Sequence, residues 1–279
     1  MNVRPTERGV ALLNALIILA VVSGVAAGVL RGGAEAQARL ALMARSDQAR
    51  ELARLGELAG LEVLDADREN STIDHLGEPW ADPDWRFETG GGTVTLHVRD
   101  AQGRFDLGAL KTPDAATVEH WTRLVEVLGG TDQDAALIAA AKPRAPSALF
   151  ALTSLDPALA AALQDHVVVL PHPAPLNVNT ATLENLMALA PGLGRADAHG
   201  LIENRPYDSV EAFRLAVARR LSPLAMEAFN RAALAVSSRY FVMESSATLD
   251  AGHAVTVSLI ERRGGGKPPV RHWRLAAAP

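Results

Sequence analysis

The sequence predicts an α+β protein in which a long N-terminal transmembrane helix packs on an antiparallel sheet, and an inserted all-α domain interrupts that sheet. The first observation is that residues 10–30 contain no charged side chain. As a helix they span about 31 Å, enough to cross the hydrocarbon core of a bilayer. The second is that strand-like alternation occurs at residues 85–107 and again at 240–275, with helical patterns between them. Strands separated by a helical block indicate one sheet with an insertion.

The N-terminal edge of the apolar segment contains a processing signal. Arg4 and Arg8 favour a cytoplasmic location for residues 1–9. Gly9 lies directly before the apolar run, whereas a secretory signal has its small-residue cleavage site after the run. Two other interpretations remain open, namely conventional cleavage after Val25-Ala26-Ala27 and an uncleaved anchor. We therefore expect a leader at residues 1–9 and a transmembrane segment at 10–30.

The helix is expected to continue to residue 64, because no proline interrupts residues 34–64. Small and apolar residues recur there at helical spacing and predict a narrow packing stripe: Ala38, Ala41 or Leu42, Ala49, Leu52, Leu55 and Ala59. Beyond it, three acidic residues are expected to form a solvated helix end: Asp65, Asp67 and Glu69.

The body divides into two sheet segments around a helical insert. Residues 65–110 form the first segment, with strands expected at 85–89, 93–100 and 103–107. Residues 111–237 read as the insert, and residues 238–279 supply strands at 240–247, 254–261 and 270–275. Because two- or three-stranded pieces are poorly stable alone, we expect both segments to share one sheet.

Within the insert, residues 171–235 are similar to helix-hairpin-helix or SAM-like modules, some of which bind DNA phosphates. Asn179 or Thr180 is expected to cap a first helix, and Asp208 or Ser209 a third. The residues that carry the resemblance are Asn177, Asn179, Thr180, Pro191, Gly192, Gly194, Arg205 and Phe213. Six arginines and six acids leave the module formally neutral, which favours a structural role over phosphate binding.

The order of the motifs resembles the K-type minor pseudopilins of type II secretion. These motifs are the Gly9-Val10 junction, Asp100-Ala-Gln-Gly-Arg-Phe-Asp-Leu107, Val167-Val-Val-Leu-Pro171, Leu176-Asn-Val-Asn-Thr-Ala181 and Ser238-Arg-Tyr-Phe241. The resemblance implies a pilin-like fold, cleavage between Gly9 and Val10 by a prepilin peptidase, and methylation of the new amino terminus. It also implies a single-pass anchor in the bacterial inner membrane, a periplasmic body and a non-enzymatic place at the pseudopilus tip. The partners it implies are the other minor pseudopilins and the major pseudopilin.

Asn14 occupies the fifth position after the expected cleavage site. Most pilins and pseudopilins have Glu there, where a carboxylate can meet the amino terminus of a neighbouring subunit inside the apolar core. A charge in that core is costly unless it is paired. Asn14 therefore fits a terminal subunit that has no neighbour ahead of it. A merely tolerated polar residue is the other interpretation.

Composition and motifs argue against a cofactor or a catalytic site. K-type relatives carry calcium ligands in the insert, but here Asp132 and Asp134 fall short of the six to eight oxygens that calcium requires. We therefore expect no retained calcium. The chain has no cysteine, and its eight histidines show no metal-ligand spacing.

The net charge of -5 disfavours a general nucleic-acid surface. The alternative function is a membrane-anchored DNA-binding or uptake protein that uses the hairpin module.

Overall fold

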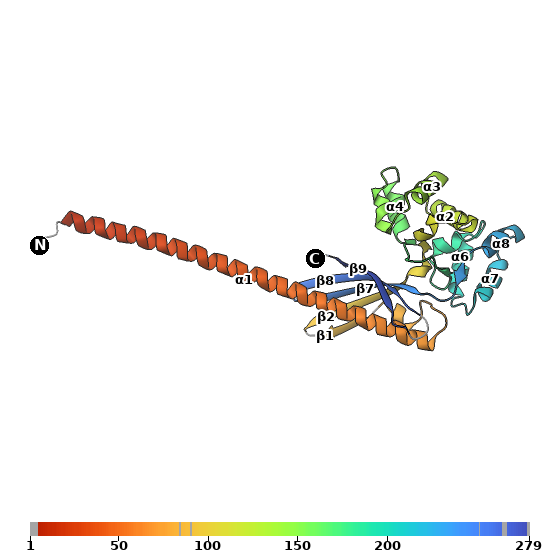
Figure 1. Ribbon diagram of the computed structural model, residues 1–279, viewed down its shortest axis with the longest axis horizontal. Helices are drawn as coiled ribbons and strands as arrows, with labels where there is room; N and C mark the ends of the chain where they lie inside the picture. Colours follow the sequence, from red (N-terminus) through yellow and green to blue (C-terminus); the bar gives the residue numbers. More distant parts are fainter. Residues whose placement is uncertain (1–4, 84, 90, 251, 264–266, 278–279) are drawn as a thin grey trace.

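A single long helix carries the body of the protein at one end (Figure 1). The computed structural model describes residues 5–83, 85–89, 91–250, 252–263 and 267–277. Helix α1 (Pro5–Asn70) lies along the sheet with its C-terminal part, and its N-terminal part extends away from the rest of the chain. The helical insert lies at the end of the molecule opposite the N-terminus.

The sheet contains five antiparallel strands in the order β1-β2-β7-β8-β9. Its strands are β1 (Arg86–Thr89), β2 (Gly92–Asp100), β7 (Tyr240–Leu249), β8 (Gly252–Glu261) and β9 (Val270–Ala277). Strand β2 pairs with β7 from Thr93 opposite Thr248 to Asp100 opposite Phe241. The two sheet segments are thus one sheet, and the prediction of an interrupted sheet is confirmed.

The helical insert leaves the sheet at Asp100 and returns at Tyr240. Its α-helices are α2 (Ala115–Val127), α3 (Asp132–Ala141), α4 (Pro157–Gln164), α5 (Leu183–Met187), α6 (Arg195–Glu203), α7 (Val210–Ala218) and α8 (Pro223–Asn230). Short 3-10 turns are η1 (Pro79–Ala81), η2 (Ala101–Gly103), η3 (Leu107–Lys111) and η4 (Pro146–Ala151). Two parallel pairs of two-residue strands complete it: β3 (Phe105–Asp106) with β4 (Val167–Val168), and β5 (Leu176–Asn177) with β6 (Leu234–Ala235).

The third strand predicted for the first sheet segment is wrong. Residues 101–103 form turn η2, and β3 pairs with β4 of the insert instead of extending the meander. Phe105, Leu107 and Leu110 are buried in the same core as Trp121 of α2. Residues 103–110 therefore pack with the insert, because their apolar side chains find partners on its helices.

The contact between α1 and the sheet is built on small residues. Ala49, Ala53, Gly56 and Gly60 are buried against the sheet, whereas Leu55 of the predicted stripe is 48% exposed. A Cβ added to Gly56 would lie 2.7 Å from Val94 Cγ1. The predicted stripe is rich in alanine, but it includes Leu55 and omits Gly56 and Gly60, where the helix approaches the strands most closely. The glycines thus mark the line of closest approach.

Glu57 lies on the same buried face of α1, at 1% exposure. Its carboxylate accepts hydrogen bonds from Arg271 (2.6 Å), Arg274 (2.8 Å) and Ser258 (2.7 Å). Burial raises the pKa of Glu57, but the hydrogen bonds from Arg274, Ser258 and Arg271 outweigh burial and lower it overall. This ion pair ties β8 and the edge strand β9 to the helix.

The module at residues 171–235 has its own core, in which Phe213 packs on Tyr207 with ring centroids 5.1 Å apart. The predicted caps need one correction. Thr182, and not Asn179 or Thr180, caps α5 by accepting from Asn185 N, because Asn179 and Thr180 are used elsewhere. Ser209 caps α7 as predicted. Gly192 has φ +84°, the left-handed conformation that favours glycine after a helix.

Candidate functional site: the junction between sheet and insert

The structure joins the sheet and the insert through a buried polar network, to which Asn177 and Thr180 of the motif at residues 176–181 belong. The network forms because β2 ends at Asp100 beside the first residues of β7. The outgoing and returning crossovers of the insert therefore lie next to each other, and the loop 71–78 after α1 closes over them.

Asp100 is the centre of the network and is 7% exposed. Its Oδ1 accepts from Gln102 N at 2.7 Å. Its Oδ2 accepts from Thr180 Oγ1 (2.5 Å), Ser238 Oγ (2.6 Å) and Asn177 Nδ2 (2.8 Å). Burial raises the pKa of Asp100, and these four donors act in the opposite direction. The donors come from three separate segments, so one carboxylate holds both crossovers and the module together.

Asn177 connects the module to the loop after α1. Its Nδ2 lies 3.0 Å from both Asp74 O and Ser238 Oγ, and its Oδ1 accepts from Asn179 N at 3.0 Å. The side chain is fully buried. Since an amide offers both donors and an acceptor, Asn fits this position in a way that Asp or Leu would not.

Gln102 closes the other side of the junction. Its Oε1 accepts from Arg239 N at 2.7 Å and Tyr240 N at 3.3 Å, and its Nε2 donates to Pro175 O at 3.0 Å. The side chain thereby satisfies backbone groups where the returning chain enters β7. Buried backbone groups need such partners, because leaving them unpaired costs about 1–3 kcal/mol each.

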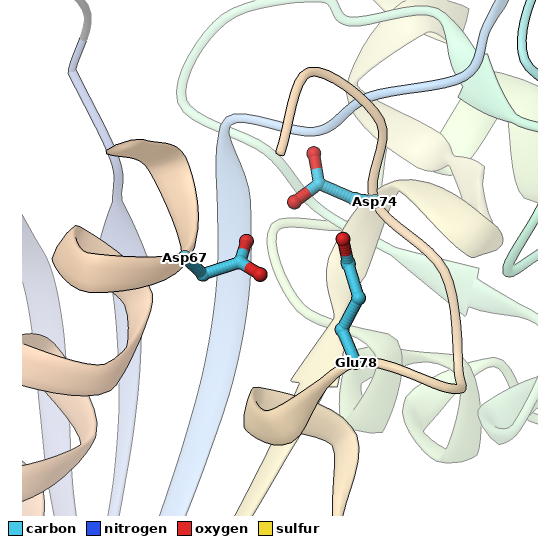
Figure 2. A group of neighbouring side chains, drawn as sticks. All are labelled: Asp67, Asp74 and Glu78. Atoms are coloured by element: carbon cyan, nitrogen blue, oxygen red, sulfur yellow. The ribbon is translucent and has the colours of Figure 1, made fainter. Parts of the chain in front are cut away.

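A cluster of three buried acids lies beside this network: Asp67, Asp74 and Glu78 (Figure 2). Arg262, directly after β8, pairs with two of them, at 2.9 Å to Asp67 Oδ2 and through Nη2 to both oxygens of Asp74. Asp67 is therefore buried, and its prediction as part of a solvated helix end is wrong. Because the helix continues to Asn70, Asp67 lies within its last turns and faces Arg262 directly after β8.

The cluster contains three buried acids and one guanidinium, which pairs with Asp67 and Asp74. Burial raises the pKa of Asp74 to about 6, although Arg262 and the amide of Ser238 lower it. Burial and the charge of Glu78 raise the pKa of Asp67. Glu78 accepts from His75 N (2.9 Å) and Trp80 Nε1 (2.8 Å). The arrangement links α1, the loop after it and the segment that follows β8.

The remaining predicted residues of the module stabilise its interior. Asn179 donates to Tyr207 O (3.0 Å) and accepts from Tyr207 N (2.8 Å). Arg205 donates to Ala181 O at 2.7 Å, and burial lowers the pKa of its guanidinium to about 10. Gly194 is the N-cap of α6, and Phe213 is fully buried. Pro191 lies exposed in the turn after α5. These contacts hold the module together from within.

At the other end of the molecule, α1 is the one helix of the described residues that is long and apolar enough to cross a membrane. Its described backbone includes Gly9 and Val10, and Asn14 is exposed on it. Arg4 lies outside the described residues. The cleavage site and the role of Asn14 stay predictions.

Asp132 and Asp134, considered above as calcium ligands, lie in the first turn of α3. Asp134 forms a capping box, accepting from Thr131 N (2.9 Å) and Thr131 Oγ1 (2.7 Å). A helix cap explains the presence of this acid. The expectation that no calcium is retained stays a prediction.

Comparison with known proteins shows what this chain is similar to. The sequence model described as "Type II secretion system (T2SS), protein K" matches residues 176–237, the module that contributes Asn177 to the junction. Over nearly its whole length the chain is similar to the type II secretion system protein K of Pseudomonas aeruginosa. The two are 29% identical over 95% of this chain and 91% of that protein.

The chain is similar to protein K of type II secretion systems. Its fold agrees with that of a chain in the crystal structure of the GspK-GspI-GspJ complex from the enterotoxigenic Escherichia coli type 2 secretion system. That match has a TM-score of 0.72 at 22% identity and covers 86% of this chain and all of the other. The sequence similarity supports the role of a type II secretion minor pseudopilin, and the structural match supports its α+β fold.

Sequence reasoning found the module but missed half of the junction. Asp74 and Arg262 belong to no motif, and the motif at residues 100–107 gave no sign of the partners of Gln102. The partners of all three residues include groups more than 100 residues away along the chain. The only available signal was polarity in unfavourable places, such as the acid at the end of the alternating strand β2.

Proposed function

We propose that this minor pseudopilin occupies the tip of the type II secretion pseudopilus, primes its assembly and supports export of folded proteins across the outer membrane. The observation that carries the proposal is the position of the insert, at the end of the molecule farthest from the membrane helix (Figure 1). In a filament whose subunits stack along their helices, an insert at this end of the molecule obstructs the next subunit. An end position removes that conflict.

The exposed N-terminal half of α1 supports assembly with other subunits. Among the described residues, large apolar side chains from Leu12 to Met43 are exposed, although only part of this length is needed to cross a bilayer. We infer that the remainder packs against the helices of neighbouring pseudopilins. By analogy with the complex of the matched structure, these neighbours include other minor pseudopilins, with the major pseudopilin next along the filament.

The proposal includes processing and location. Prepilin peptidase would cleave between Gly9 and Val10, leaving an inner-membrane anchor with the body in the periplasm. Gly9→Leu should leave the leader attached, whereas Gly24→Leu, deeper in the apolar segment, should not. Intact-mass analysis checks this, and a mature chain beginning at Gly28 would indicate conventional signal cleavage instead.

A purely structural role without catalysis or nucleic-acid binding also forms part of the proposal. Five of the six arginines of the module already engage protein groups: Arg195 with Glu184, Arg205 with Ala181 O, Arg214 with Asn230, Arg220 with Asp197 and Arg231 with Glu119. A phosphate surface needs guanidinium groups that are available to a ligand. A gel-shift measurement at moderate salt should therefore show no DNA binding.

The tip assignment is tested by co-producing the full chain with its companion minor pseudopilins. Size-exclusion chromatography with light scattering should find a stoichiometric complex, and immunogold labelling should mark filament ends. Labelling along the whole pseudopilus, or long fibres formed by this chain alone, would refute the assignment.

A further inference from the structure

A groove with positive charge and an apolar floor runs between edge strand β9 and the insert. Two adjoining pockets form it and share Arg144, Val169 and Trp273. Val242 and Leu259 of the sheet complete the floor. This face of the sheet is opposite to α1, since the neighbouring Arg271 and Arg274 on β9 reach Glu57 of the helix.

The groove is incompletely covered by the chain's own side chains. Trp273 is 38% exposed and Leu275 is 63% exposed, although both continue the buried apolar surface formed by Val242 and Leu259. A tryptophan left half-open beside an apolar floor is typical of a protein contact site, because Trp is enriched among the residues that dominate binding energy.

The charged residues around the groove are all basic: Arg104, Lys111 and Arg144. Among the described residues, none of the three has an ion pair within 4 Å or a side-chain hydrogen bond. Burial and the nearby Arg99 lower the pKa of Arg104, and the charges of Asp165 and Asp100 act in the opposite direction. On a chain with net charge -5, three basic side chains that have no ion pair within 4 Å among the described residues line one groove, which favours a ligand that brings carboxylates.

We propose that this basic groove binds an acidic segment of a companion minor pseudopilin, with a large apolar side chain seated against Trp273 and carboxylates paired with Arg104, Lys111 and Arg144. The inference rests on the proposed function, because a subunit whose helix lies along the exposed part of α1 places its body beside the sheet. Figure 1 shows β9 at the side of the sheet, below the overhanging helices of the insert. A neighbouring body can reach the groove from there.

Charge reversal tests the electrostatic half of the proposal. The variant with Lys111→Glu and Arg144→Glu should weaken binding of the full chain to its companion at least tenfold and reduce the salt dependence of the dissociation constant. The matched control, Arg219→Glu with Lys267→Glu, changes the net charge equally at exposed positions outside the groove. It should stay within twofold of the parent.

Photocrosslinking tests the identity of the occupant. A crosslinking residue at position 275 in the full membrane-bound chain should capture one companion minor pseudopilin, with the crosslink mapping to an acidic segment. The same residue at position 224, where Leu224 is 78% exposed on α8, serves as the control and should not capture that segment. A crosslink from 275 only to an exported protein or to a second copy of this chain would overturn the proposal.

The outcomes separate the two proposals. If the parent chain forms no complex with its companions, the proposed function fails. If the complex forms and groove variants bind as tightly as the control, the groove inference alone fails. Should the double variant not fold, as judged by circular dichroism, Leu275→Glu replaces it, because that side chain is exposed and carries little folding energy. A normal affinity for folded Leu275→Glu would likewise refute the groove.

Discussion

Replacing Asn177 should separate the two parts of the molecule energetically. Asn177→Ala removes the donor that reaches Asp100 Oδ2, Asp74 O and Ser238 Oγ, and the acceptor for Asn179 N. The hydrogen bond to the ionised Asp100 contributes about 1.5–3 kcal/mol, and the neutral ones about 0.5–1.5 kcal/mol each. Because two amide hydrogens serve three acceptors, the terms do not add fully. We expect a loss of about 3–5 kcal/mol in the free energy of unfolding.

Asn177→Asp tests the electrostatic reason for this loss. It keeps the shape of the side chain but places a second carboxylate against buried Asp100, so at pH 7 it should destabilise the protein more than alanine does. The excess over alanine should shrink as the pH falls, because one carboxyl of the pair then takes up a proton.

The measurement is thermal and urea unfolding of the detergent-solubilised full chain, followed by circular dichroism. For a body of this size, the alanine variant should lower the melting temperature by about 6–20 °C. Asn204 provides the control, since its exposed side chain only donates to Gly200 O of its own helix. Asn204→Ala should cost less than about 1 kcal/mol. Equal losses at both positions would refute the reasoning, as would an unchanged Asn177→Ala variant.

Three further predictions concern the helix, the acid cluster and metal binding. Gly56→Val should destabilise the contact between α1 and the sheet by about 1–3 kcal/mol, whereas Gly32→Val, where no atom lies within 4 Å, should not disturb it; equal unfolding midpoints would contradict this. The raised pKa of Asp74 (about 6, against 3.8) contributes stability that is present below pH 3.8 and lost as the pH rises through 6. Compared with Asp74→Asn, the parent should therefore gain stability as the pH falls from 7 to 5; the comparison cancels His120, whose pKa, lowered to about 4 by burial, acts oppositely. Chelator should shift the melting temperature by less than ~1 °C, and a large drop reversed by calcium would reveal a metal site.

The sequence by itself determined the parts whose cause is local. The uncharged run at residues 10–30 predicts a membrane helix by length and polarity alone, and the alternation in β2 reappears as alternating burial. Ser209 could be predicted as a cap because a cap and its helix are adjacent in sequence. The order of the motifs, and not any single one, indicated the family.

Only the tertiary structure decided which residues meet across the chain. The stripe on α1 was misjudged at Leu55 because helical periodicity records which residues share a face, and not how closely a sheet approaches that face. Asp67 was taken for a solvated acid because its partner Arg262 lies 195 residues away. The same holds for Asp100 and Asn177: a sequence shows that each is polar, but only the fold makes them neighbours and turns four separate segments into one junction.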